Sequence, residues 1–192
     1  MLTIFFAGIA LTGAMTNMEM IESVVSEAMI PIASQVAGEG ADTIVLEVNG
    51  EHPGSWLLEQ TAVSVLNNAG LTVTNAREEG SWKLRIRPME MSVTYARTER
   101  SWILGGKRIP RLATCQLSAF LEDSLGNVVL AAREGAVLNS TVSAGEIALL
   151  ESVAEKWVNG VHTGEESGNL LEPLVVTGVV TALVYLFYSS RN

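Results

Sequence analysis

The residues that could do chemistry are few in this sequence and lie far apart along the chain. Histidine occurs only at His52 and His162, and aspartate only at Asp42 and Asp123. A Ser-His-Asp triad needs a nucleophile, a base and an orienting carboxylate within hydrogen-bonding reach of one another, and no motif here indicates that arrangement. The glycine-rich phosphate loop that ends in Lys-Ser or Lys-Thr is also absent. We therefore predict that the protein is not an enzyme and has no catalytic residue.

Metal and cofactor sites are not expected either. Cys115 is the only cysteine, which excludes an internal disulfide and a multi-cysteine metal site. Adjacent glutamates occur at Glu78–Glu79 and Glu165–Glu166, where neighbouring glycines indicate solvated turns. Cys115 itself lies in the apolar run Leu112–Leu121, so we expect it to pack in the core as a small hydrophobic side chain.

Positive charge is concentrated in one window of an otherwise acidic chain. The net charge is −9, yet eight of the twelve Lys and Arg residues fall between Lys83 and Arg111, where only Glu90 and Glu99 oppose them. That window therefore carries +6 and the rest of the chain −15. A uniformly acidic protein would not show this pattern.

The second half of this window, Arg97–Arg111, places cations on both sides of an apolar point. Trp102 is followed by Ile-Leu-Gly-Gly, and such a tip suits an acidic partner or an anionic membrane surface. An ordinary long hairpin loop, with Trp102 folded back on the core, is the alternative. Nucleic acid is not expected, because export would separate it from the protein and the overall charge is acidic. The predicted binding residues are Arg97, Arg100, Trp102, Lys107, Arg108 and Arg111.

The N-terminal segment, 1–19, is predicted to be a signal peptide or an apolar N-terminal segment. Its first fourteen residues are almost all apolar or small, and Thr12 and Ala14 suit positions −3 and −1 of a cleavage site. The positively charged start that such leaders usually carry is missing. Cleavage and export are expected on this pattern.

The C-terminal segment, 170–192, is predicted to be a transmembrane anchor with a short tail. The stretch Leu174–Tyr188 has no charged residue, and Arg191 follows it, as expected of a membrane helix with a cytoplasmic end. Gly178 and Ala182 lie four residues apart, which would let two such helices pack closely and form a homo-oligomer. A buried C-terminal core helix is the alternative.

Between the ends, residues 20–161 are predicted to form one extracytoplasmic α+β domain, and 162–169 a polar linker. Apolar spacing indicates helices at Met20–Val36 and Trp56–Ala69, and Ser143-Ala-Gly-Glu146 is a capping box that would open a third. Period-two alternation at Trp82–Ile86 indicates a strand with one buried and one wet face. We expect a mostly antiparallel sheet packed by amphipathic helices, plus the C-terminal transmembrane helix. The remaining strands are predicted at Thr43–Val48, Leu71–Thr74, Met89–Tyr95, Arg111–Leu121 and Val128–Val137.

The order of these segments resembles a small domain shared by the curli-secretion lipoprotein, the lipoprotein activators of penicillin-binding proteins and the N-terminal domain of TolB. The resemblance covers about residues 20–160 and rests on pattern: the strand Thr43–Val48, the helix and strand in Leu57–Val73, the strand opening at Gly80-Ser-Trp, and the hairpin Leu117–Leu130. This chain departs from it by having no N-terminal lipid-anchor cysteine and by its apolar C-terminal segment. The resemblance implies a binding or assembly module rather than an enzyme, with no catalytic residue to carry over.

Taken with the two ends, it implies a non-enzymatic module of a bacterial-type cell envelope, held at the inner membrane with its domain in the periplasm. The expected partners are another envelope protein or protein complex, and membrane lipid through the C-terminal helix. The alternative function is an accessory subunit of a multi-protein membrane transport or secretion complex.

Overall fold

The computed structural model describes residues 14–74, 81–97, 99–100 and 107–162. For residues 99, 100 and 107 only the backbone is described. The chain divides into two compact units, 1–162 and 163–192. All described residues belong to the first unit.

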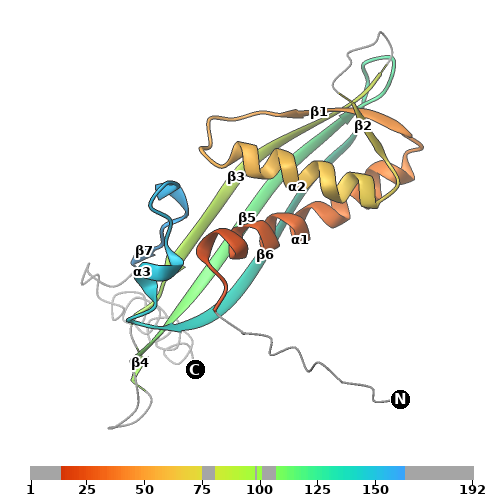
Figure 1. Cartoon of the computed structure of the whole chain (residues 1–192). Coiled ribbons are helices and arrows are strands. Elements are labelled where there is room, and N and C mark those ends of the chain that lie inside the picture. The colour runs from red at the N-terminus through yellow and green to blue at the C-terminus, as the bar shows by residue number, and fades with distance from the viewer. Residues whose placement is uncertain (1–13, 75–80, 98, 101–106, 163–192) are drawn as a thin grey trace, which may run out of the picture. The chain divides into compact units, whose positions relative to one another are not determined.

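A sheet and two long helices make up most of the described fold (Figure 1). The main path of the sheet runs β2-β1-β3-β5-β4, while β6 pairs with β5 and β7 with β3. Arg108 of β5 pairs with both Glu99 of β4 and Ser143 of β6, so β4 and β6 flank β5 on opposite sides. In chain order the elements are α1 (Asn17–Gly38), β1 (Thr43–Val48), α2 (Ser55–Asn68), β2 (Thr72–Thr74), β3 (Trp82–Tyr95), β4 (Glu99–Arg100), β5 (Lys107–Glu122), β6 (Val128–Ser143), α3 (Ile147–Leu150), the 3-10 helix η1 (Lys156–Val158) and β7 (Val161–His162).

The sheet is mixed, which corrects the mostly antiparallel sheet predicted from the sequence. β1 runs parallel to both β2 and β3, and β3 runs parallel to β7. Only the pairings of β5, with β3, β4 and β6, are antiparallel. The reason is the helix α2, which carries the chain from the end of β1 back to its start and so makes β2 parallel to β1.

The predicted fold class also included a transmembrane helix, and this too is corrected. The predicted helix, at 170–192, lies outside the described residues. In the part of the chain that the structure describes, no helix is long and apolar enough to cross a membrane. The described residues therefore form an α+β domain with a mixed sheet.

The helix α1 begins at a capping box that fixes where the chain becomes helical. The Thr16 hydroxyl accepts a hydrogen bond from the Glu19 backbone N–H at 3.2 Å, and the Glu19 carboxylate accepts one from the Thr16 backbone N–H at 2.6 Å. Two backbone donors that a helix start leaves free are satisfied in this way. Pro31 lies inside this helix.

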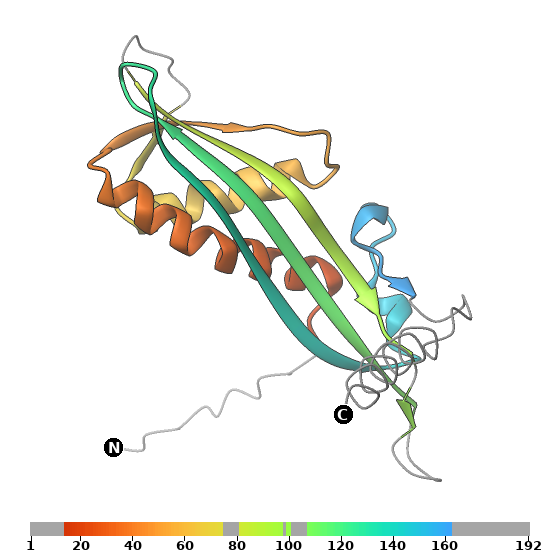
Figure 2. The same ribbon diagram turned by 180° about the vertical axis from the view of Figure 1, so that it is seen from behind.

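The core lies between the two helices and one face of the sheet (Figure 1). Side chains alternate along the strands, so Leu84 and Ile86 of β3 and Leu117 of β5 are fully buried against the helices. Figure 2 shows the opposite face of β3, β5 and β6, over which no helix passes. The predicted core position of Cys115 is confirmed, since its side chain is completely buried.

A β-bulge in β3 changes, partway along the strand, whether even-numbered or odd-numbered residues face the core. Residues up to Pro88 pair in register with β5, and the register shifts between Pro88 and Glu90 so that Met89 has no partner. Even-numbered residues point to the core before the bulge, and odd-numbered residues such as Met91 and Tyr95 do so after it. Proline suits this place, because it has no N–H to contribute to the ladder.

The helix expected after Ser143 is only partly present. The predicted capping box does not open the helix, whose N-cap is Glu146 without a side-chain hydrogen bond. The Glu146 carboxylate does accept hydrogen bonds from the Ser143 backbone N–H and hydroxyl, each at 2.8 Å. The helix α3 nevertheless ends after one turn, because Glu151 takes up an extended backbone. Trp157 still reaches the core from η1, where its indole N–H donates to Glu155 and its ring meets His52 edge-on at 5.2 Å.

Trp157 fits because Gly54 has no side chain, which gives a test of this packing. A Cβ at position 54 would lie 2.4 Å from the Trp157 ring and 2.7 Å from the Met91 methyl group. Gly54→Ala should therefore lower the free energy of unfolding by about 1–3 kcal/mol through overpacking. The matched control is Gly145→Ala, where a Cβ would have nothing within 4 Å. Equal melting temperatures for the two variants would show that Trp157 does not pack there.

A second prediction concerns alkaline stability. Burial, with a smaller contribution from the charge of Glu90, raises the pKa of the Cys115 thiol from 9.0 to about 12. Between these values the unfolded chain loses the proton and the folded chain keeps it, so stability falls as pH rises from 9 to 12. The slope from this group should approach about 1.4 kcal/mol per pH unit. Cys115→Ala should remove that part of the slope in denaturant titrations, and an unchanged slope would contradict the prediction.

Candidate functional site

The predicted cationic segment lies at one end of the sheet, where β3 leads through β4 into β5. Glu99 and Arg100 of β4 pair with Arg108 and Lys107 of β5, so the chain forms a hairpin here (Figure 1). The side chains of Arg97 and Arg108 are exposed. Trp102 lies outside the described residues, as do Gly178 and Ala182, and the side chains of Arg100 and Lys107 are not described.

Arg111, the last of the predicted binding residues, points into the protein. Its side chain is only 1 % exposed, so it does not belong to a surface. One guanidinium nitrogen donates to the Asn17 side-chain oxygen at 3.0 Å, and another donates to the Met15 backbone carbonyl. Sequence reasoning missed this burial, because an arginine that opens a strand is usually solvated.

Asn17 is the centre of this buried cluster. Its amide nitrogen donates to the Tyr95 hydroxyl and to the Val158 carbonyl, both at 3.1 Å. Its carbonyl oxygen accepts from the Tyr95 hydroxyl at 3.2 Å as well as from Arg111. One side chain thus connects the start of α1, the end of β3, the start of β5 and η1.

The cluster holds a positive charge without an ion-pair partner. Among the described residues no carboxylate lies within ion-pairing distance of Arg111, and its Nε is buried with no hydrogen-bond partner. Burial lowers the pKa of Arg111, against the attraction of groups that include Glu146 and Glu19. Burial also raises the pKa of Tyr95, although the hydrogen bond with Asn17 opposes that shift. Such a charge is tolerated only when neutral oxygens surround it, which is the arrangement seen here.

Asn17→Ala should therefore be far more damaging than a usual surface substitution. It removes four hydrogen bonds and leaves the Arg111 charge short of an acceptor, so we expect a loss of about 3 kcal/mol in the free energy of unfolding. Asn139→Ala, on the exposed side of β6, is the control and should change it by less than about 0.5 kcal/mol. Chemical denaturation of both variants measures the difference. Similar values would mean that the cluster does not hold this end of the fold.

The candidate catalytic side chains have structural contacts and do not come together. The His52 Nδ1 accepts from the Gly54 backbone N–H at 3.0 Å, and His162 stacks on Tyr95 at 4.9 Å between ring centroids. Asp123 closes the turn between β5 and β6, where hydrogen bonds from the Asn127 side chain and backbone lower its pKa. Within the described residues no group of three His, Cys, Asp or Glu side chains could hold a metal ion.

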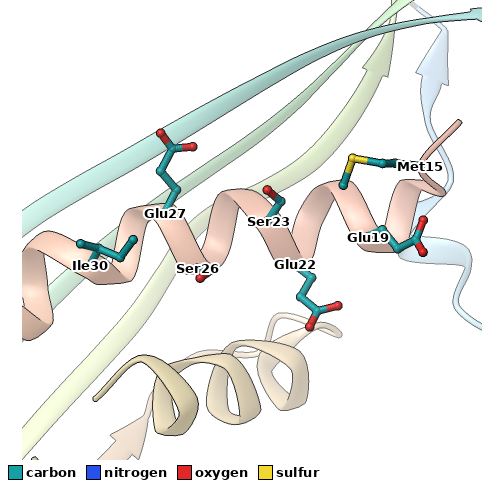
Figure 3. A pocket seen from close by; sticks show the side chains of 7 residues that line it. All are labelled: Met15, Glu19, Glu22, Ser23, Ser26, Glu27 and Ile30. Atoms are coloured by element: carbon teal, nitrogen blue, oxygen red, sulfur yellow. The ribbon is translucent and has the colours of Figure 1, made fainter. Parts of the chain in front are cut away.

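An open depression of about 660 Å³ lies on the outer side of α1 (Figure 3). It contains three carboxylates, yet Glu22 points toward α2 and Glu27 toward the opposite side of the helix. The carboxylate of Glu19 is already bound by Thr16 in the capping box. The depression therefore does not gather its charges on one point. The residues that line it are Met15, Glu19, Glu22, Ser23, Ser26, Glu27 and Ile30.

Sequence reasoning missed one surface, the side of β3, β5 and β6 that faces away from the helices. The alternation of Lys83, Arg85 and Arg87 predicted a wet face for one strand. It did not show which residues of other strands would lie beside these cations. That depends on register, and the register places Phe120 opposite Arg85 and Arg133 two positions from Ala131 on the next strand.

Comparison with known proteins finds no matching family model and no matching curated protein. Solved structures of bacterial lipoproteins do match. A minor lipoprotein from Acinetobacter baumannii is 13% identical with a TM-score of 0.35, over 62% of this chain and 85% of that one. Rare lipoprotein B from Shewanella oneidensis is also 13% identical with a TM-score of 0.35, over 73% and 98% of the two chains. The LpoB C-terminal domain from Salmonella enterica is 11% identical with a TM-score of 0.31, over 58% and 97%.

These structures confirm the predicted resemblance, because the proteins to which this chain is similar are bacterial lipoproteins. TM-scores of 0.31 to 0.35 are too low for the likeness to support an argument about what this chain does. That argument has to come from its own residues.

Proposed function

We propose that this protein is a non-enzymatic binding module of a bacterial cell envelope, which recognises another envelope protein through the end of the β3–β5 hairpin. The observation that carries the proposal is the exposure of Arg97, which precedes β4, and of Arg108, which pairs with Glu99 of β4. The apolar start of the chain, with its predicted cleavage site, supports export to the periplasm.

The buried cluster beneath the hairpin supports the proposal, because a binding surface needs a rigid base. Tyr95 is the last residue of β3 and Arg111 lies near the start of β5, and both are fixed by Asn17. The strands therefore leave the core in a defined geometry before they reach Arg97 and Arg108. A preorganised surface binds more tightly, since less conformational entropy is lost on association.

The charge of the hairpin gives the partner its character. Exposed arginines in a chain of net charge −9 make this end a local positive field, which speeds encounters with an acidic surface and weakens with salt. The same surface would serve an accessory subunit of a larger transport or secretion complex, or a contact between copies of the chain. These are alternatives for the identity of the partner.

The test reverses the exposed charges. Full-length tagged protein with Arg97→Glu and Arg108→Glu should recover its envelope partners at least about tenfold less well than the unchanged protein. Native pulldown followed by mass spectrometry measures this, and the size of the recovered complex separates a single partner from a multi-protein assembly. The matched control is Lys156→Glu, an exposed cation on η1, which should recover the same partners as before.

Both variants should keep their melting temperature, because exposed side chains rarely affect stability by more than about 0.5 kcal/mol. A folded double variant that recovers every partner in the original amount would show that the hairpin end is not the binding surface.

A further inference from the structure

The open sheet face, defined as the side of β3, β5 and β6 that points away from α1 and α2, is a second surface with its own chemistry (Figure 2). Among the described residues no helix covers it, although its strands are fourteen to sixteen residues long. Arg87 and Tyr95 are eight positions apart on β3, which at about 3.3 Å per residue separates this part of the face from the hairpin end by roughly 25 Å. The two surfaces can therefore be tested separately.

Phe120 lies on β5, the middle strand of this face, two residues before the strand ends at Glu122, and its strand neighbours include basic residues. It lies directly opposite Arg85 on one side and Ala131 on the other. Lys83 and Arg87 precede and follow Arg85 on the same face, and Arg133 follows Ala131. Residues on diagonal positions of neighbouring strands are about 7–8 Å apart, which long side chains span. Four cations thus surround one aromatic ring.

The exposure of these groups indicates an unfilled surface rather than a closed set of internal contacts. Phe120 is 44% exposed, so much of its ring is available for contact. Arg85 pairs with Glu122, and Arg133 donates to the Gln116 side-chain oxygen at 3.0 Å. Arg87 is exposed, and no hydrogen bond or ion pair is found for it among the described residues.

One row of the face has the geometry of an anion clamp. Arg87 pairs with Ser118, and Ser118 pairs with Arg133 on its other side. Neighbouring strands lie about 4.8 Å apart, so the two arginines leave the sheet roughly 10 Å from one another with a hydroxyl between them. Two guanidinium groups at this spacing can converge on one carboxylate, and the hydroxyl can donate a third hydrogen bond.

We propose that the open sheet face binds an acidic segment of a protein, with a carboxylate between Arg87 and Arg133 and an aromatic or aliphatic side chain on Phe120. Charge complementarity selects this occupant. The four cations outnumber the three carboxylates of the same face region, Glu47, Glu90 and Glu122, within a chain that is otherwise strongly acidic. Phe120 then adds apolar contact that a purely ionic surface would not provide.

The experiment measures fluorescence anisotropy of labelled polymers with the purified full chain. The probes are a random copolymer of glutamate and tyrosine, poly-glutamate, and polyphosphate of similar length. We expect the copolymer to bind tightest, because it alone offers carboxylates together with aromatic rings. Arg87→Glu and Arg133→Glu should each weaken it at least about tenfold, whereas the control Lys156→Glu should change it less than about twofold.

Phe120→Ser separates the two contributions. It should reduce the affinity for the copolymer to that for poly-glutamate and leave poly-glutamate binding unchanged. Polyphosphate binding as tight as the copolymer, or arginine variants that bind the copolymer as before, would overturn the proposal. Arg97→Glu with Arg108→Glu should leave copolymer binding intact, so loss of the hairpin function and loss of this one are distinguishable.

Discussion

The buried charge of Arg111 is the constraint on which one end of the fold depends. A guanidinium group without an ion-pair partner in the described residues is stable inside a protein only if fixed dipoles take the place of water. Here those dipoles come from Asn17 and from the Met15 carbonyl. Both belong to the start of α1, so this helix start must be in place before the beginning of β5 can be buried. Packing and electrostatics are thus coupled at one point.

The same cluster also contacts the C-terminal part of the described chain. Asn17 also binds the Val158 carbonyl, and Tyr95 lies against Gly160 and His162. A Cβ on Gly160 would lie 2.1 Å from the Tyr95 ring, which shows how closely the backbone approaches. Segments more than 140 positions apart in sequence are therefore joined around one asparagine.

Local patterns in the sequence were sufficient for most of the elements. The apolar spacing of α1 and α2, the alternation in β3 and the turn at Asp123–Asn127 each predict the structure found. Strand direction was not predictable in this way, since β1 and β2 have the same local pattern whether they run parallel or antiparallel. The long helix predicted after Ser143 is not found, because the chain becomes helical only after Glu146 and takes up an extended backbone at Glu151.

The candidate surfaces show the same limit. The excess of cations at 83–111 was visible in the sequence, but its division into three environments was not. Arg111 is buried, Arg97 and Arg108 are exposed at the hairpin end, and Lys83, Arg85 and Arg87 lie on the open sheet face. Only strand register brings Phe120 and Arg133 beside the last group. The number of cations can be counted in the sequence, whereas the residues that lie beside each cation depend on the strand register.

The bulge at Met89 has a consequence for how β3 can change in length. The bulge adds a single residue to β3 relative to β5. If Met89 were absent, the side chains that face the core would alternate without a break along the whole strand. Loss of this residue would therefore leave every core side chain of β3 facing the core. Loss of a paired residue of β3 would instead move the side chains between that position and the bulge to the opposite face of the sheet. Met89 is therefore the one position of the paired strand at which a deletion would not change which side chains face the core. Its side chain is half exposed and the residue has no pairing partner.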